Sequence, residues 1–198
     1  MEWRRLMKFI PLVILSTLLT GCAFTRDYVD IEYKPNCTPQ EILGAENVEV
    51  AVHIDDVRFK ENIGCKINGY GIEMANIMAS NDLSEVFKNA IIWELEQRGF
   101  VITCGGNHLD VELIKFFNNF KPIYFGARAD SETILNVTLR NENGVMVYSK
   151  TIFGFGEEEI CFLAGGNNAR LALERSLYQA IQKLMKDPGF IGALLESN

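Results

Sequence analysis

The sequence predicts an α+β fold in which an antiparallel sheet of about four to six strands carries two amphipathic helices packed on one face. Three observations predict it. Several stretches alternate apolar and polar residues, as half-buried strands do, and two longer stretches have the apolar period of a helix. Tight turns join consecutive strands, which requires antiparallel pairing. Because each helix is apolar along one stripe, the two helices can cover one sheet face and leave the other to water or a partner.

The domain is predicted to begin with a strand over residues 48–54, where valines and an isoleucine alternate with polar residues. A second short strand is predicted over 64–67. Asn68-Gly69 is a turn signal after it, so residues 63–78 are predicted to form a hairpin.

The clearest helix is predicted over residues 82–98. Asp82 can cap its first turn, and Gly99 follows as a stop. One broad apolar face should pack on the sheet. Ile92 lies among polar residues on the opposite face, where it is either a partner contact or a single exposed apolar side chain.

Four more strands and a second helix complete the predicted domain. Asn143-Gly144 suits a hairpin turn between the last two strands, and Pro188-Gly189 ends the helix. Residues 118–126 are predicted to form a loop. The strands are predicted at 100–104, 109–117, 129–140 and 145–156, and the helix at 169–186.

The composition limits the classes of protein to which the chain can belong. Its 198 residues suit one domain with a tether, and 48% hydrophobic residues supply a core, which argues against intrinsic disorder. A net charge of −7 argues against a nucleic-acid partner, because an acidic surface repels phosphate groups. Only two histidines are present, so we expect neither a metal site nor a cofactor.

The first residues have the pattern of a secretory signal peptide. Arg4, Arg5 and Lys8 precede an apolar run that ends at Leu19-Thr20-Gly21-Cys22. This ending resembles the bacterial lipobox, and the resemblance implies cleavage after residue 21 and thioether lipidation of Cys22. Residues 1–21 are therefore predicted to be a signal peptide, and acyl chains on Cys22 to hold the protein on a membrane.

The residues after Cys22 suggest the location. Position 23 is alanine and not the aspartate that the sorting rule of diderm bacteria associates with the inner membrane, which implies the outer membrane, facing the periplasm. Residues 22–46 mix charged residues and prolines without a sustained period, and are predicted to be the lipidated N-terminus and a flexible tether. Residues 47–198 then form one periplasmic α+β domain.

Four cysteines remain besides Cys22, an even number in a compartment that permits disulfides. Three pairings are possible. We favour Cys37 with Cys65 and Cys104 with Cys161, because the last two each end a predicted strand. Four unpaired buried thiols are the alternative. A zinc site is disfavoured, because no Cys-x-x-Cys pair is present.

Several segments of the chain form a recognisable set: Ser84-Glu85-Val86-Phe87, the run from Trp93 to Ile102, the strand Leu109 to Leu113, and the closing helix after Asn167-Asn168-Ala169. Together they resemble the YajG-like outer-membrane lipoproteins. The similarity covers about residues 47–191 plus the lipobox, and such patterns also occur in auxiliary lipoproteins of envelope transport systems. The resemblance implies a lipid-anchored accessory protein that faces the periplasm, and it carries over no catalytic residues.

One aromatic segment lies outside that resemblance. It consists of Phe116, Phe117, Phe120, Tyr124 and Phe125. A loop this rich in aromatic residues is costly to leave in water, so it either packs on the sheet or docks on a partner, a lipid or a glycan.

The expected function follows from the location and from the lack of a catalytic set. His53 faces outward on its predicted strand, His108 lies in a turn, and Glu157-Glu158-Glu159 suits a solvated edge, so we expect no enzyme. The preferred hypothesis is a non-catalytic scaffold or accessory subunit of an outer-membrane or trans-envelope complex, with an envelope protein as partner. The alternative is a periplasmic binding module for a lipid or cell-wall glycan that uses the aromatic segment 116–125. The oligomeric state stays open.

Overall fold

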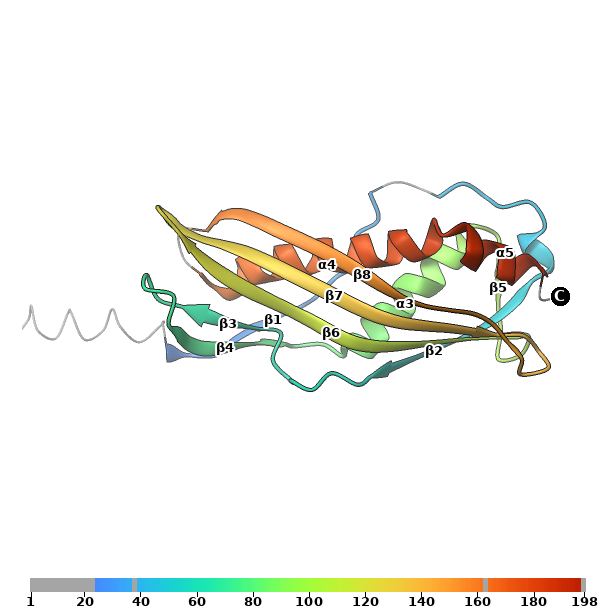
Figure 1. The fold of residues 1–198 in the computed structure, drawn as a ribbon, viewed down its shortest axis with the longest axis horizontal. Helices are drawn as coiled ribbons and strands as arrows, with labels where there is room; N and C mark the ends of the chain where they lie inside the picture. The colour runs from blue at the N-terminus through green and yellow to red at the C-terminus, as the bar shows by residue number, and fades with distance from the viewer. Residues whose placement is uncertain (1–23, 37–38, 162–163, 197–198) are drawn as a thin grey trace, which may run out of the picture.

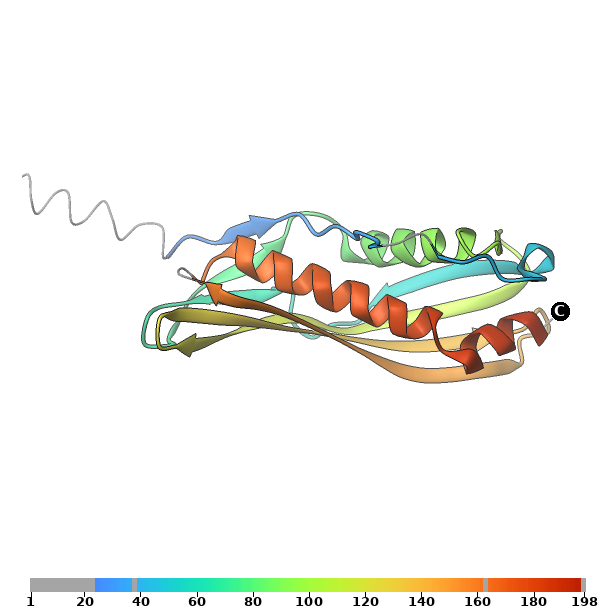
Figure 2. The same ribbon diagram turned by 90° about the horizontal axis from the view of Figure 1, so that it is seen from above.

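Eight strands form one mixed sheet in the described part of the chain, and helices lie along one side of it (Figures 1 and 2). The computed structural model describes residues 24–36, 39–161 and 164–196. The strands are β1 (Asp27–Val29), β2 (Glu49–Asp56), β3 (Gly64–Ile67), β4 (Glu73–Ala79), β5 (Val101–Ile102), β6 (Asn107–Ile123), β7 (Gly126–Arg140) and β8 (Met146–Cys161). The α-helices are α3 (Leu83–Glu96), α4 (Gly166–Met185) and α5 (Pro188–Glu196), and a 3-10 turn, η1, spans Ala45–Asn47.

The α+β class is confirmed, but the sheet is larger than predicted and is not purely antiparallel. Strand β2 pairs with β6 in parallel, from Val50 opposite Asn107 to Asp56 opposite Leu113. Parallel neighbours need a crossover connection, and α3 lies in the chain between these two strands. The alternation within β2 shows that the strand is half-buried but not which strand it joins. Helix α5 adds a third helix to the two that the sequence predicts.

Strands β6, β7 and β8 form a long antiparallel meander, and β6 continues into the predicted loop 118–126, which leaves residues 124–125 as the turn to β7. It pairs with β7 as far as Ile123. Asn118 is buried within it, and its Oδ1 accepts a hydrogen bond from the Ser131 hydroxyl at 2.9 Å. Pro122 is tolerated because β3 meets β6 only at Asn118, which leaves the end of β6 without a strand on that side. The loop prediction is therefore wrong for residues 118–123.

Helix α4 packs closely against β8 because two positions of that strand are glycine. A Cβ atom at Gly154 would lie 2.1 Å from the carbonyl oxygen of Ser176. At Gly156 it would lie 1.9 Å from the carbonyl oxygen of Ala172. Only a residue without a side chain allows the helix backbone to come this near.

Side chains of α4 also cover the free edge of β8. Gln179 Oε1 accepts a hydrogen bond from the Phe155 N–H at 2.8 Å, and Lys183 Nζ donates to the Phe153 carbonyl at 2.8 Å. Arg175 donates to the carbonyl of Glu157. The three helix residues are spaced by four, so they lie on one face of α4. They satisfy backbone groups that would otherwise pair with another strand.

The start of the predicted tether is folded onto the domain. Strand β1 pairs in parallel with β4, with Asp27 opposite Ile77. Asp27 Oδ2 accepts a hydrogen bond from the N–H of Gly166 at 2.8 Å, at the first residue of α4. Ile31 is buried, and its N–H and carbonyl are both bound by the side chain of Asn81. Residues 27–31 therefore belong to the domain, whereas the predicted signal peptide and Cys22 lie outside the described residues.

A buried polar cluster joins this segment to α3 and α4. Glu94 is fully buried, and it accepts hydrogen bonds from the Tyr33 hydroxyl, from Arg98 and, at 2.7 Å, from Gln182. Arg98 also donates to the Glu94 carbonyl at 2.8 Å. Burial, together with the hydrogen bond to Glu94, raises the pKa of Tyr33. The cluster fixes the N-terminal segment to both helices.

Candidate functional site

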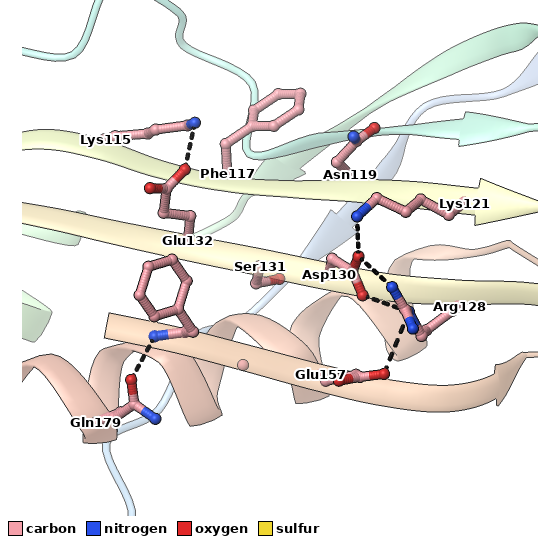
Figure 3. A pocket seen from close by; sticks show the side chains of 12 residues that line it. Lys115, Phe117, Asn119, Lys121, Arg128, Asp130, Ser131, Glu132, Glu157 and Gln179 are labelled. Atoms are coloured by element: carbon pink, nitrogen blue, oxygen red, sulfur yellow. Dashed lines mark hydrogen bonds and ion pairs between the residues drawn. The ribbon is translucent and has the colours of Figure 1, made fainter. Parts of the chain in front are cut away.

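The face of the meander opposite the helices is the candidate functional site, and we call it the open face. Side chains alternate along each strand, so one set points to the helices and the other to the open face. Figure 2 shows α3 and α4 on the other side of the sheet. On the open face, a hollow of about 580 Å³ lies over the second half of β6 and the facing parts of β7 and β8 (Figure 3).

Strand register arranges the lining of the hollow in rows. Phe117 lies opposite Glu132, which lies opposite Phe155, so one carboxylate stands between two phenyl rings. The neighbouring row begins with Asn119 opposite Asp130. Both rings carry a nearby cation: Lys60 Nζ lies 5.2 Å from the centroid of Phe117, and a lysine of α4 lies 5.3 Å from that of Phe155.

Opposite charges pair across the hollow, as Figure 3 shows. Lys115 Nζ lies 2.5 Å from Glu132 Oε2 on the next strand. Asp130 is bound on both sides, by Lys121 Nζ at 2.5 Å and by Arg128 Nε at 2.8 Å. Arg128 also lies 3.2 Å from Glu157 of β8. The hollow is therefore polar and charged but locally neutralised.

These pairs shift the ionisation of the groups involved. Burial alone would raise the pKa of the Asp130 carboxyl, but the hydrogen bonds from Arg128 and Lys121 outweigh it and lower the pKa. The same hydrogen bond to Asp130 raises the pKa of Arg128, and the charge of Glu157 adds to the rise. Both groups are thus held in their charged forms.

The Asp130→Asn substitution is expected to lower stability at neutral pH and to leave it unchanged in acid. A carboxyl whose pKa is lowered in the folded state stabilises the fold fully above its unfolded pKa, about 3.9, and this contribution is lost as the pH falls from there through the folded-state pKa. Because these side chains are partly exposed, we expect a difference of about 0.5–1 kcal/mol at pH 7. Urea unfolding at pH 7 and pH 3 measures it. A difference as large at pH 3 as at pH 7 would contradict the assignment. Glu142→Gln in an exposed turn is the control.

The aromatic segment is divided by the strand and does not form one patch. Phe116 and Phe120 point into the core, where the ring of Phe116 meets the edge of Phe87 at a centroid distance of 5.4 Å. Only Phe117 lines the hollow. Tyr124 and Phe125 lie in the turn after β6 and are exposed, so the prediction of a single aromatic loop at 116–125 is corrected.

The other predicted contact and site residues lie apart from the hollow. Ile92 is half-buried on α3, on the helical side of the sheet. His53 of β2 lies 3.2 Å from Asp55, and both are exposed. Among the described residues, no group of three or more histidine, cysteine or acidic side chains is placed to hold a metal ion.

The predicted disulfides are not formed where the structure can show them. Cys65 and Cys104 are free thiols, and burial raises the pKa of Cys65. Cys161 lies opposite Ala127, at the start of β7. Cys104 lies just before β6, and the start of β6 pairs with the opposite end of β7, at Arg140. At a rise of about 3.3 Å per residue, these ends are roughly 40 Å apart, far beyond the reach of a disulfide. Cys37 lies outside the described residues.

Sequence reasoning did not find Arg128, Asp130 and Glu132 as site residues. Their signal was the alternation of apolar and polar residues over 135–140, which, extended backwards by the strand period of two, puts positions 128, 130 and 132 on the polar face. The partners of these residues depend on the register between β6 and β7, which alternation alone does not determine.

Solved structures share the fold at low sequence identity. Protein XCC0632 from Xanthomonas campestris, assigned to DUF330, is 12% identical, with a TM-score of 0.58 over 87% of this chain and 96% of that chain. A second structure, described as an uncharacterized protein, is 12% identical, with a TM-score of 0.51 over 82% of this chain and 97% of that chain. A minor lipoprotein from Acinetobacter baumannii is 3% identical, with a TM-score of 0.45 over 71% of this chain and 91% of that chain. For the first two structures, the likeness extends to the fold alone at these identities.

The remaining comparisons concern the sequence and its relation to membranes. None of the curated proteins matches the chain. No helix in the described ranges is both long and apolar enough to cross a bilayer. The sequence profile of the family described as uncharacterized lipoprotein matches residues 35–194, which is most of the chain. The protein therefore belongs to this lipoprotein family, whose name indicates a membrane-anchored envelope protein.

Proposed function

We propose that the protein is a non-catalytic accessory subunit of an outer-membrane or trans-envelope complex. Acyl chains on Cys22 hold it in the outer membrane, facing the periplasm, and a protein partner binds its open face. Membership of a lipoprotein family supports the anchor. Alanine at position 23 supports the outer membrane, because the retention aspartate is absent there.

The observation that carries the proposal is the composition of the hollow on the open face. Aromatic rings and arginine are enriched in protein interfaces, and charges at an interface need compensation when a partner excludes water. The rings and the arginine are those of Phe117, Phe155 and Arg128. The charges are compensated because the acidic and basic side chains of the hollow pair with one another. A partner can therefore cover this hollow without leaving its charges unpaired.

A photo-crosslinking amino acid in place of Phe155 tests the partner in intact envelopes. The matched control carries it in place of Leu43, an exposed apolar residue away from the meander. We expect a discrete adduct from position 155 and not from position 43. Adding Arg128→Glu to the first variant should weaken the adduct, because three acidic groups would then meet and Lys121 would be the cation that remains beside them. Recovery of the protein alone from position 155, or the same adduct from both positions, would contradict the proposal.

A cell-wall glycan is a second candidate ligand, favoured by one row of the hollow. Phe117 and Phe155 flank Glu132, and rings beside a hydrogen-bond acceptor suit a sugar, which is apolar on its faces and polar at its rim. Sedimentation with purified sacculi tests this. Phe155→Ala should weaken binding about tenfold, which corresponds to about 1.4 kcal/mol. Val147 is exposed on the same strand, so Val147→Ala should leave binding to sacculi unchanged. Equal binding of both variants would rule out glycan binding at Phe117, Glu132 and Phe155.

A further inference from the structure

One end of the molecule carries exposed aromatic residues from two different turns. Tyr70, in the turn between β3 and β4, is 91% exposed, and Ile72 beside it is also exposed. In the turn between β6 and β7, Tyr124 is 92% exposed and Phe125 is 73% exposed. Side chains of this size that face water in a group are unusual on a monomeric protein and mark a contact site.

The two turns lie side by side. A Cβ atom at Gly71 would be 3.0 Å from Cγ of Pro122, so the turn of one hairpin touches the end of the other. Both views of the ribbon place the two turns at the same end of the sheet (Figures 1 and 2). The turn between β7 and β8 lies at the opposite end.

The N-terminal segment reaches the same end. Strand β1 runs parallel to β4 with Asp27 opposite Ile77, so the residues before Asp27 lead toward the start of β4 and the turn at Tyr70. In Figure 1 the start of the described chain lies at this end of the sheet. Phe24, the first described residue, is exposed. Cys22 precedes it by two residues, and covalent geometry limits the distance between their Cα atoms to about 7 Å. Acyl chains on Cys22 would therefore enter a bilayer close to this end.

We propose that these two turns, residues 70–72 and 123–125, insert their aromatic side chains into the surface of the bilayer that holds Cys22. The inference rests on the proposed lipidation of Cys22. Tyrosine suits this layer, because its ring is apolar and its hydroxyl remains in contact with water and headgroups. Contact at both turns and at the anchor gives three points of attachment. Three points fix the orientation of the protein on the membrane as well as its position. The strands then stand on the membrane by one end, with the open face pointing sideways into the periplasm.

Depth-dependent fluorescence quenching in reconstituted vesicles tests the orientation. The mature protein, purified from envelopes in mild detergent, is placed in vesicles of phosphatidylcholine and phosphatidylethanolamine with brominated acyl chains. Anionic lipid is left out so that any signal reports apolar contact. Two variants are compared: Tyr124→Trp at the proposed contact, and Val145→Trp in the exposed turn at the opposite end. The half-buried Trp93 is common to both. Quenching of Tyr124→Trp should exceed that of Val145→Trp at least about twofold, as expected of an interfacial ring. Tyr70→Trp should behave like Tyr124→Trp.

Flotation of the vesicles separates the anchor from the orientation. Protein that floats with the lipid but shows no quenching at either site would overturn the contact and leave the anchor intact. Equal quenching at both ends would also overturn it, because the molecule would then lie flat. Protein that does not float would refute the anchor on Cys22 and, with it, both the proposed location and this inference.

Discussion

The Gly156→Ala variant is expected to lose about 3 kcal/mol of unfolding free energy, at the upper end of what overpacking costs. The added methyl group would meet the carbonyl oxygen of Ala172, and a backbone atom inside a helix cannot rotate out of the way. Helix α4 must therefore move away from β8, which also weakens the cover of the strand edge. Urea unfolding followed by circular dichroism gives the free energy.

Gly69→Ala is the matched control for this substitution. No atom lies within 4 Å of a Cβ at Gly69, so we expect a change within about 0.5 kcal/mol. If Gly156→Ala were equally mild, the close packing of α4 on β8 would be wrong.

The Glu94→Ala variant is expected to lose about 3–5 kcal/mol, because it leaves the guanidinium of Arg98 buried without its carboxylate. The hydroxyl of Tyr33 loses its acceptor as well, so the N-terminal segment should become more accessible to protease. Glu96→Ala, exposed on the same helix, should stay within about 0.5 kcal/mol of the parent chain.

A double substitution distinguishes an unpaired charge from a simple loss of packing. Glu94→Leu combined with Arg98→Met removes both charges and keeps apolar volume, so it should recover most of the stability lost in Glu94→Ala. A double variant as unstable as the single one would show that the cost does not come from the buried guanidinium.

Local signals predicted local structure well. The cap at Asp82 and the stop at Gly99 place α3 within a few residues of its observed bounds, and the Asp82 side chain accepts the hydrogen bond from the N–H of Ser84. The turn at Asn143-Gly144 joins two antiparallel strands, as predicted. In these cases the residues that decide the structure are neighbours in the chain.

Features that depend on distant residues were missed. Asn118 and Pro122 favour a loop by themselves, yet β7 holds them in a strand, and a hydroxyl from that strand donates to the buried Oδ1 of Asn118. The parallel pairing of β2 with β6 left no local signal, and neither did the separation of Cys104 from Cys161. The hollow needs three strands in register, so its polar residues could be predicted to share a face but not to meet as pairs.

The hydrogen bonds from Arg175, Gln179 and Lys183 to the backbone of β8 affect how neighbouring copies of the protein can associate on a membrane. Copies fixed to one leaflet share a plane, where their local concentration is high. Over residues 153–157, the main chain already has partners within its own molecule, so a neighbouring copy finds no free ladder there to extend. Association between copies at that stretch is left to side chains, and the contacts between charged side chains weaken with added salt.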